Sequence, residues 1–163
     1  MKRLLLTRHA KSTWGDINTL DHDRELDDEG VEEARQMSKK LIGENVTFDS
    51  MITSSASRAL STCKIVASEL SFKLDGIKID KGIYGANCEQ LKEIICKTDE
   101  SIESLAVFGH NPTLCNLSDS LHSKSIFNFP TCSMLYVELA TKSWHNCFNS
   151  DKRTLFFKYP QNV

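Results

Sequence analysis

The sequence predicts an α/β fold: a three-layer α/β/α sandwich with a mostly parallel central sheet and antiparallel strands at its C-terminal edge. Short apolar runs alternate with segments of helical period through about the first 120 residues, which is typical of a parallel sheet covered by helices on both faces. Near the C-terminus two strand-like runs are joined by a polar turn, which indicates an antiparallel pair. The 163 residues, 40% of them hydrophobic, fit a single domain over residues 1–163.

Six short runs, apolar or rich in β-branched residues, are predicted to be strands. They cover residues 2–7, 48–54, 76–84, 104–109, 133–140 and 153–159. The run at 104–109 is the clearest and the run at 76–84 the weakest. Residues 12–26, after the first strand, have no sustained period and are predicted to form a loop.

Four helices are predicted from apolar residues spaced three and four apart behind an N-capping residue. The expected caps are Asp27, Ser54 or Ser55, Asn87, and Asn111 with Pro112 at the first helical position. The expected inner faces carry Val31, Ala34, Met37 and Leu41, then Ala59, Cys63, Val66, Ala67 and Leu70, then Leu91, Ile94 and Ile95, and last Leu114, Leu117 and Leu121. Gly43 is expected to form the C-cap of the first helix.

The composition excludes several classes of function. With a net charge of −2, the chain has no basic coat that would draw it to nucleic acid or to an anionic membrane surface. No apolar stretch has the length of a signal-peptide core or a membrane span, so a cytoplasmic protein is expected. The six cysteines form no C-x-x-C pair and are expected to be free thiols that pack as small hydrophobes.

Four cationic or titratable residues come at the ends of predicted strands. Arg8 and His9 follow the first strand, Arg58 lies in the first turn of the helix after the second, and His110 follows the clearest strand. Because open parallel sheets bind ligands outside the carboxyl ends of their strands, these side chains are expected to face one crevice. Taken singly, an exposed arginine or a structural histidine would be ordinary, but the shared edge favours a site.

The position of Arg58 indicates a bound anion. A cation in the first turn of a helix is opposed by the positive end of the helix dipole, at a cost of about 0.3–1 kcal/mol. A bound phosphate would make the position of Arg58 favourable, since free N–H groups and two guanidinium groups can surround a dianion. The adjacent charges of Arg8 and His9 have the same explanation.

Three segments carry a resemblance to a known family: TRHAKS (7–12), SSASRALSTC (54–63) and FGHNPTL (108–114). They resemble the three signatures of the histidine phosphatase superfamily, which has the phosphoglycerate mutase-like fold. DHDREL at 21–26, followed by Gly30, and IYGA at 83–86 are similar to segments of the small SixA-type phosphohistidine phosphatases.

The resemblance implies that His9 is the nucleophile of a covalent phosphohistidine intermediate, with Arg8, Arg58 and His110 completing the phosphate pocket. Arginines would then take the electrostatic role that Mg²⁺ often plays, so an enzyme without metal or other cofactor is expected. Ser12 could hydrogen-bond a phosphate oxygen or simply terminate the strand region. Arg24 could contact the substrate or only hold the loop in place.

The chain departs from mutases and many phosphomonoesterases of the family, which have a carboxylic acid after the middle strand. The matching segment here, GIYGAN, has no carboxylate. Asp21 is the best substitute as proton donor, and a loop-ordering carboxylate is at least as good an interpretation. An alkoxide leaving group needs a proton, whereas the imidazole of phosphohistidine leaves more easily, so the missing acid favours phosphohistidine as substrate.

The leading prediction is therefore a phosphatase that dephosphorylates phosphohistidine on a protein, for example on a histidine-containing phosphotransfer domain. One alternative is a small-molecule phosphomonoesterase that uses the same chemistry. An alternative of another class is a non-catalytic module that binds phosphate or a phosphoprotein. No nucleic acid and no membrane is expected among the partners.

Overall fold

Six strands form one mixed sheet in the computed structural model, which describes residues 1–162. In chain order they are β1 (Lys2–Arg8), β2 (Ser50–Ser54), β3 (Ile77–Asp80), β4 (Ser104–Gly109), β5 (Met134–Leu139) and β6 (Lys152–Lys158). They lie side by side in the order β3-β2-β4-β1-β5-β6. The pairs among the first four strands are parallel, whereas β5 and β6 pair antiparallel with their neighbours. The predicted mixed sheet is thereby confirmed.

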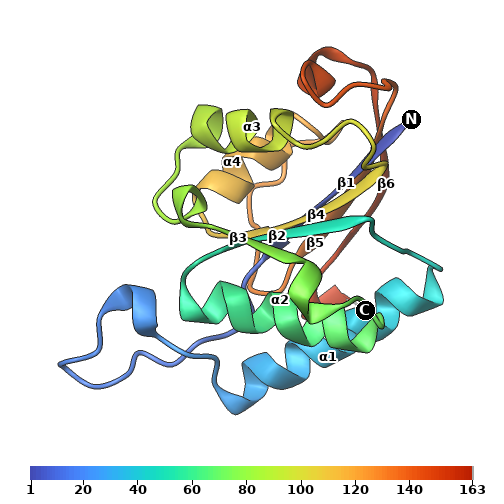
Figure 1. The fold of residues 1–163 in the computed structure, drawn as a ribbon. Helices are drawn as coiled ribbons and strands as arrows, with labels where there is room; N and C mark the ends of the chain where they lie inside the picture. Colours follow the sequence, from blue (N-terminus) through green and yellow to red (C-terminus); the bar gives the residue numbers. More distant parts are fainter. Residues whose placement is uncertain (163) are drawn as a thin grey trace.

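Four helices cover the two faces of this sheet (Figure 1). The first pair, α1 (Asp28–Gly43) and α2 (Ser57–Glu69), packs on one face, and the second pair, α3 (Cys88–Cys96) and α4 (Thr113–Asp119), packs on the other. Short 3₁₀ turns lie at 21–23, 74–76, 81–83, 147–149 and 160–162. The three-layer α/β/α arrangement is as predicted. Within residues 1–162, no helix has the length and apolar character that spanning a bilayer requires.

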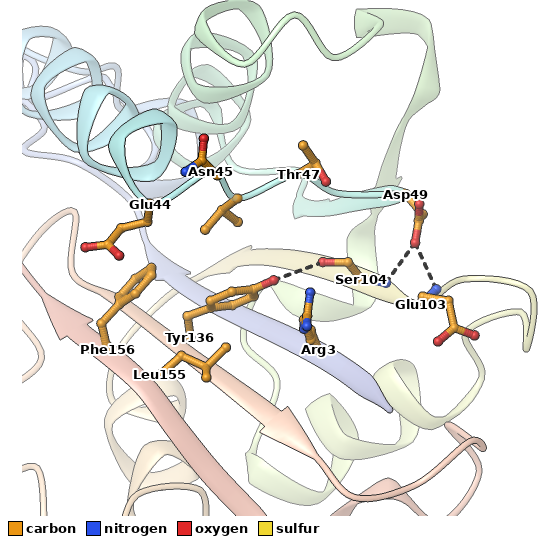
Figure 2. Close-up of a pocket in the computed structure, with 11 residues that line it drawn as sticks. Arg3, Glu44, Asn45, Thr47, Asp49, Glu103, Ser104, Tyr136, Leu155 and Phe156 are labelled. Atoms are coloured by element: carbon orange, nitrogen blue, oxygen red, sulfur yellow. Dashed lines mark hydrogen bonds between the residues drawn. The ribbon is translucent and has the colours of Figure 1, made fainter.

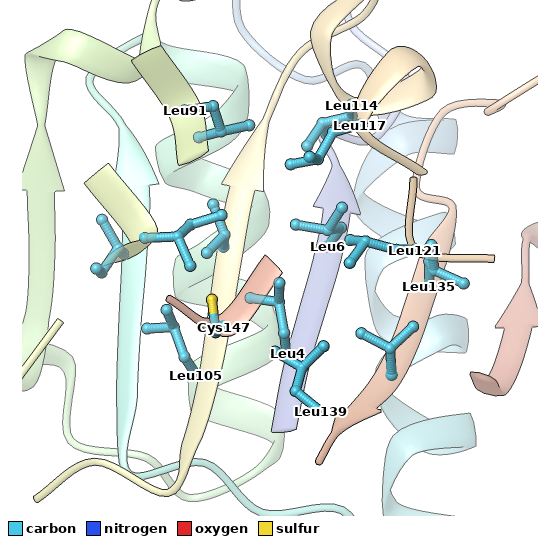
Figure 3. Close-up of a cluster of buried hydrophobic side chains, with 14 of the residues drawn as sticks. Leu4, Leu6, Leu91, Leu105, Leu114, Leu117, Leu121, Leu135, Leu139 and Cys147 are labelled. Atoms are coloured by element: carbon cyan, nitrogen blue, oxygen red, sulfur yellow. The ribbon is translucent and has the colours of Figure 1, made fainter. Parts of the chain in front are cut away.

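Neighbouring residues of β1 supply two separate cores, because successive side chains of a strand point to opposite faces. Leu4 and Leu6 belong to the cluster under α3 and α4 that Figure 3 shows, while Leu5 packs with the residues of α1 and α2. All three side chains are fully buried. A strand buried on both faces has no polar side, which explains why this segment is a continuous leucine run.

Two of the predicted helix caps are confirmed. The Asp27 side chain accepts a hydrogen bond from the Gly30 N–H at 2.7 Å, at the start of α1. Asn87 and Gln90 form a reciprocal capping box at α3, with both hydrogen bonds at 2.9 Å. Most of the expected inner-face residues are buried, although Val31, Leu70 and Ile94 are only partly covered.

The other two N-cap predictions are wrong. Helix α2 begins after Ala56, not after Ser54 or Ser55, because the Ser54 hydroxyl lies against His110. Helix α4 has Pro112 as its N-cap. The Asn111 amide donates instead to the Phe129 carbonyl at 2.9 Å, which joins two loops.

The C-cap prediction for Gly43 also fails. Helix α1 continues through Gly43, and the chain turns at Asn45, whose φ of 55° lies in the left-handed region. Asparagine tolerates this region better than most residues, so the turn needs no glycine.

The predicted loop at 12–26 projects beyond the layers of the molecule (Figure 1). Its base is closed by a bridge between Ser12 and Leu26. At Gly30 a Cβ atom would lie 1.9 Å from the Lys11 carbonyl oxygen, so only glycine allows α1 to approach the loop this closely. The loop is therefore anchored at its base, next to the end of β1.

All six cysteines are free thiols, as predicted. Cys63, Cys132 and Cys147 are buried, and the other three are half-buried.

Candidate active site

The four strand-end residues lie together at one edge of the sheet. Arg8 ends β1 and His9 follows it, Arg58 is the second residue of α2, and His110 follows β4. All four line a cavity of about 380 Å³. The cavity is also lined by Lys11, Ser12, Trp14, Arg24, Asn111 and Thr131. The four residues that the sequence predicts to face one crevice therefore lie together in the structure.

His9 is held in one orientation and one protonation state. Its Nδ1 lies 2.8 Å from the Ala10 carbonyl oxygen, which can only accept, so Nδ1 carries a proton. Burial, with a smaller contribution from the nearby His110, Arg58 and Arg8, lowers the pKa of His9 to about 3. The ring is then neutral at pH 7 and has its lone pair on Nε2. The Arg58 Nε–H points at this atom from 3.3 Å.

Arg58 is 6% exposed and contacts two other groups. Its Nη1 donates to the Asp21 carbonyl oxygen at 2.6 Å, and its Nη2 donates to Asp21 Oδ2 at 3.0 Å. A guanidinium group has more N–H donors than these contacts and the one to His9 use, so Arg58 can also bind a ligand oxygen.

His110 and Arg8 complete the set of nitrogen groups. His110 Nε2 lies 2.8 Å from Ser54 Oγ, and its ring centroid lies 5.3 Å from that of His9. Burial, followed by the charges of Arg58 and Arg8, lowers the pKa of His110 to about 4. Arg8 Nη1 donates to the Phe129 carbonyl at 3.0 Å.

Two buried nitrogens of this set have no hydrogen-bond partner among residues 1–162: Arg8 Nε and His110 Nδ1. Buried polar atoms without a partner are rare in folded proteins and call for an explanation. A polar ligand at the cavity is the explanation that the surrounding positive charge favours.

Asp21 lies at the mouth of the cavity, and three donors hold its carboxylate in place. Its carboxylate accepts hydrogen bonds from Tyr84 Oη at 2.7 Å, Arg24 Nη1 at 3.0 Å and Arg58 Nη2. The Tyr84 hydroxyl, followed by the two arginines, holds the pKa of this carboxyl well below its usual range. A group that is ionised at neutral pH has no proton to give, so the structure disfavours the predicted proton-donor role of Asp21.

Arg24 and Ser12 order the loop. Arg24 donates to the Thr13 carbonyl and to Ser12 Oγ, both at 2.8 Å, and stacks 4.3 Å from the centroid of the Trp14 ring. Together with Asp21, these contacts occupy all three guanidinium nitrogens. Of the two interpretations left open by the sequence, the geometry favours loop ordering for Arg24, while Ser12 still lines the cavity.

Sequence reasoning missed several residues of this site. Tyr84 contacts Asp21 and packs its ring edge-on against His110, with centroids 5.6 Å apart. Buried Glu33 accepts from the Lys11 N–H at 2.9 Å and faces Thr131. The segment IYGA at 83–86 contains Tyr84, but its similarity to SixA-type phosphatases and its lack of a carboxylate assign no role to the tyrosine. No sequence signal distinguished Glu33 from the other charges of its helix.

A larger cavity of about 490 Å³ lies near the opposite, amino-terminal end of β1 and is shown in Figure 2. Its charged groups are already paired with protein atoms. Asp49 Oδ2 accepts from the backbone N–H groups of Glu103 and Ser104, both at 2.9 Å, and Arg3 contacts Glu138 at 3.3 Å. The cavity with unpartnered nitrogens is therefore the better candidate for a charged ligand.

The lowered pKa values of the two histidines predict an acid-sensitive fold. Between pH 6.5 and about 4, the unfolded chain binds protons at both positions and the folded chain does not, so the free energy of unfolding falls as the pH falls. At pH 5 the expected loss relative to pH 7.5 is about 1–2 kcal/mol per histidine. The raised pKa of Glu33 acts in the opposite direction and offsets part of this loss.

Urea unfolding at pH 7.5 and pH 5.0, in phosphate-free buffer, measures the effect. A His9→Asn variant should show a smaller loss than the natural chain, because one of the two groups is gone. An equal loss in both proteins would contradict the lowered pKa of His9.

Comparison with known proteins identifies the family. Residues 4–91 match the histidine phosphatase superfamily, branch 1. An uncharacterised chloroplastic protein of Arabidopsis thaliana is 27% identical over 155 residues, which cover 90% of this chain and 71% of that protein. A 2,3-bisphosphoglycerate-dependent phosphoglycerate mutase of Azorhizobium caulinodans is 41% identical over 73 residues. That match covers 43% of this chain but only 35% of the mutase.

The fold has a counterpart over its whole length. A protein of Agrobacterium tumefaciens named as the phosphohistidine phosphatase SixA superposes with a TM-score of 0.82, covering 98% of both chains at 23% sequence identity. The family match includes more than half of the chain, with most of β1, the loop and α2 inside it. The chain thus belongs to branch 1 of the histidine phosphatase superfamily and has the fold of its SixA members.

Proposed function

We propose that this protein is a phosphatase that forms a covalent phosphohistidine intermediate on His9 and dephosphorylates phosphohistidine on a protein. One observation carries the proposal: a neutral His9 whose Nδ1–H is held by the Ala10 carbonyl turns its Nε2 lone pair toward Arg58. An imidazole fixed in this tautomer can act as a nucleophile, and the cations beside it can neutralise the negative charge of a phosphoryl group.

In the first step, Nε2 of His9 attacks phosphorus while the bond to the leaving group breaks. The leaving atom takes the electron pair of the broken bond. Arg8 and Arg58 bind the phosphoryl oxygens, whose charge they neutralise during transfer. The Nδ1 proton of His9 stays on the ring, where the Ala10 carbonyl stabilises the positive charge that develops.

In the second step, water attacks the phosphorus atom of phospho-His9. The P–N bond breaks, its electron pair returns to Nε2, and the imidazole is again neutral with its proton on Nδ1. His110 faces the same space, and as a neutral imidazole it can accept a proton from the attacking water. Phosphate leaves, His110 releases its proton to solvent, and the site is restored.

The proposed chemistry requires no metal or other cofactor, because the arginines supply the positive charge. Among residues 1–162, no group of three or more His, Cys, Asp or Glu side chains is arranged to hold a metal ion.

Phosphohistidine is favoured over a phosphate ester because Asp21 holds no proton that it could give to a departing ester oxygen. The nearby Tyr84 hydroxyl already donates its proton to Asp21. The similarity to SixA, named a phosphohistidine phosphatase, supports the same substrate class. The partner would be a phosphorylated protein such as a histidine-containing phosphotransfer domain. The six free thiols fit a reducing compartment such as the cytoplasm.

Incubation with a ³²P-labelled phosphohistidine protein and, separately, with p-nitrophenyl phosphate tests the proposal. We expect phosphate release from the phosphohistidine protein with a kcat/KM well above that for the ester. Rapid turnover of the ester with no effect on the phosphohistidine protein would indicate the phosphomonoesterase. Binding of the phosphoprotein with no release from either substrate would indicate the non-catalytic module.

A further inference from the structure

The carboxylate of Asp21 lies one guanidinium group away from the nucleophile. Arg58 donates from Nε to His9 Nε2 at 3.3 Å and from Nη2 to Asp21 Oδ2 at 3.0 Å. A phosphoryl group bound by Arg58 and attacked by His9 is therefore close to a second, negatively charged group. A carboxylate repels a nearby phosphate, and this repulsion is offset where the carboxylate is paired with cations, as Asp21 is, or interacts with another part of the substrate.

The position of this carboxylate is fixed by three donors, yet it can still be reached from solvent. Tyr84 and the two arginines orient it, and 54% of the Asp21 side chain remains exposed at the mouth of the cavity. A carboxylate has more acceptor positions than three donors fill. Asp21 can thus accept one more hydrogen bond, from a group that enters with the substrate.

A phosphorylated imidazole carries a group suited to this acceptor. One ring nitrogen bears the phosphoryl group and the other can bind a proton, which makes the ring cationic. When His9 displaces such a ring, the electron pair of the P–N bond goes to the departing nitrogen and the proton stays on the distal one. The ring leaves as neutral imidazole, and no separate proton donor is needed.

We propose that the Asp21 carboxylate determines the specificity of this site by accepting a hydrogen bond from the distal ring N–H of a protonated phosphoimidazole. An ester has no such N–H, and its departing oxygen gains negative charge next to the carboxylate, so the same group disfavours esters. This inference rests on the proposed function and adds to it a residue that discriminates between the two substrate classes.

The test compares N-phosphohistidine with p-nitrophenyl phosphate in Asp21→Asn. Asparagine keeps an oxygen that can accept from Arg58 but has no negative charge. We expect kcat/KM for N-phosphohistidine to fall at least about tenfold, as for loss of a charged hydrogen-bond partner, while kcat/KM for the ester stays within about threefold or rises. Because both substrates are assayed on one preparation, partial unfolding cancels in their ratio.

Two further variants sharpen the result. Asp21→Glu keeps the charge and should recover part of the preference for N-phosphohistidine. Asp23→Asn removes a carboxylate of the same 3₁₀ turn, one that contacts His22, and both activities should stay within about twofold.

Three outcomes would overturn the inference. An equal fall for both substrates means that Asp21 only holds Arg58 in place. A rise for both, with tighter inhibition by tungstate, means that the carboxylate competes with the phosphoryl group for Arg58. If the natural chain does not hydrolyse N-phosphohistidine or a phosphohistidine protein at all, the proposed function itself is wrong.

Discussion

Replacing His9 with asparagine is expected to lower kcat/KM for a phosphohistidine protein by at least about 10⁴-fold, because the nucleophile is lost. Asparagine is the informative substitution. Its Nδ2–H can replace the Nδ1–H that donates to the Ala10 carbonyl, so the local fold is retained, but it has no atom at the position of Nε2. The variant should still bind tungstate, since Arg8 and Arg58 remain.

The covalent intermediate supplies a second measurement. Brief reaction with ³²P-labelled substrate, followed by an alkaline quench, should label the natural chain on His9 and leave His9→Asn unlabelled. His145→Gln changes an exposed histidine in the 141–151 segment and should keep both label and activity. Retention of more than about one per cent of the activity by His9→Asn would show that another group attacks phosphorus.

The strands β1 and β4 could be predicted because they are buried on both faces of the sheet. The apolar runs at 2–7 and 104–109 match β1 and β4 almost residue for residue. The antiparallel pair β5 and β6 was also predicted, although its connection, expected to be a polar turn, packs Trp144 and Cys147 into the core. In these segments local sequence and tertiary burial require the same structure.

Helix caps were less predictable where a polar side chain has two possible partners. Ser54 and Asn111 both have the residue type of a cap, yet one faces His110 and the other donates to the Phe129 carbonyl. These partners are distant in the sequence, so no local pattern reveals them. The burial of Lys2 also depends on partners that are distant in the sequence. Its ammonium group donates to the carbonyls of Glu100 and Ile102, in the connection between α3 and β4.

The site likewise has features that follow from local sequence and features that depend on distant contacts. The positions of Arg8, Arg58 and His110 follow from strand ends, which the sequence reveals. The protonation states of His9 and Asp21 do not. They depend on the burial of His9 and on the contacts of Asp21 with Tyr84 and Arg58, which are distant in the sequence. The sequence therefore allowed Asp21 to be a proton donor, and only the three-dimensional contacts favour an ionised carboxylate.

Arg58→Lys is expected to lower kcat/KM by about 10²–10³-fold, which is the usual effect of removing one preorganised donor from a transition-state site. Lysine keeps the positive charge but is a single point donor, whereas the planar guanidinium of Arg58 reaches His9 Nε2, the Asp21 carbonyl and Asp21 Oδ2 at once.

The loss should appear mainly in kcat, because charge still attracts the substrate but no longer holds the oxygens, the nucleophile and Asp21 in one geometry. Steady-state kinetics separate kcat from KM, and Arg35→Lys, on the exposed side of α1, is the matched control. If Arg58→Lys kept its kcat and only KM rose, Arg58 would act as a simple electrostatic attractor. In that case the alignment of His9 with Asp21 through one guanidinium group would have no role in the reaction.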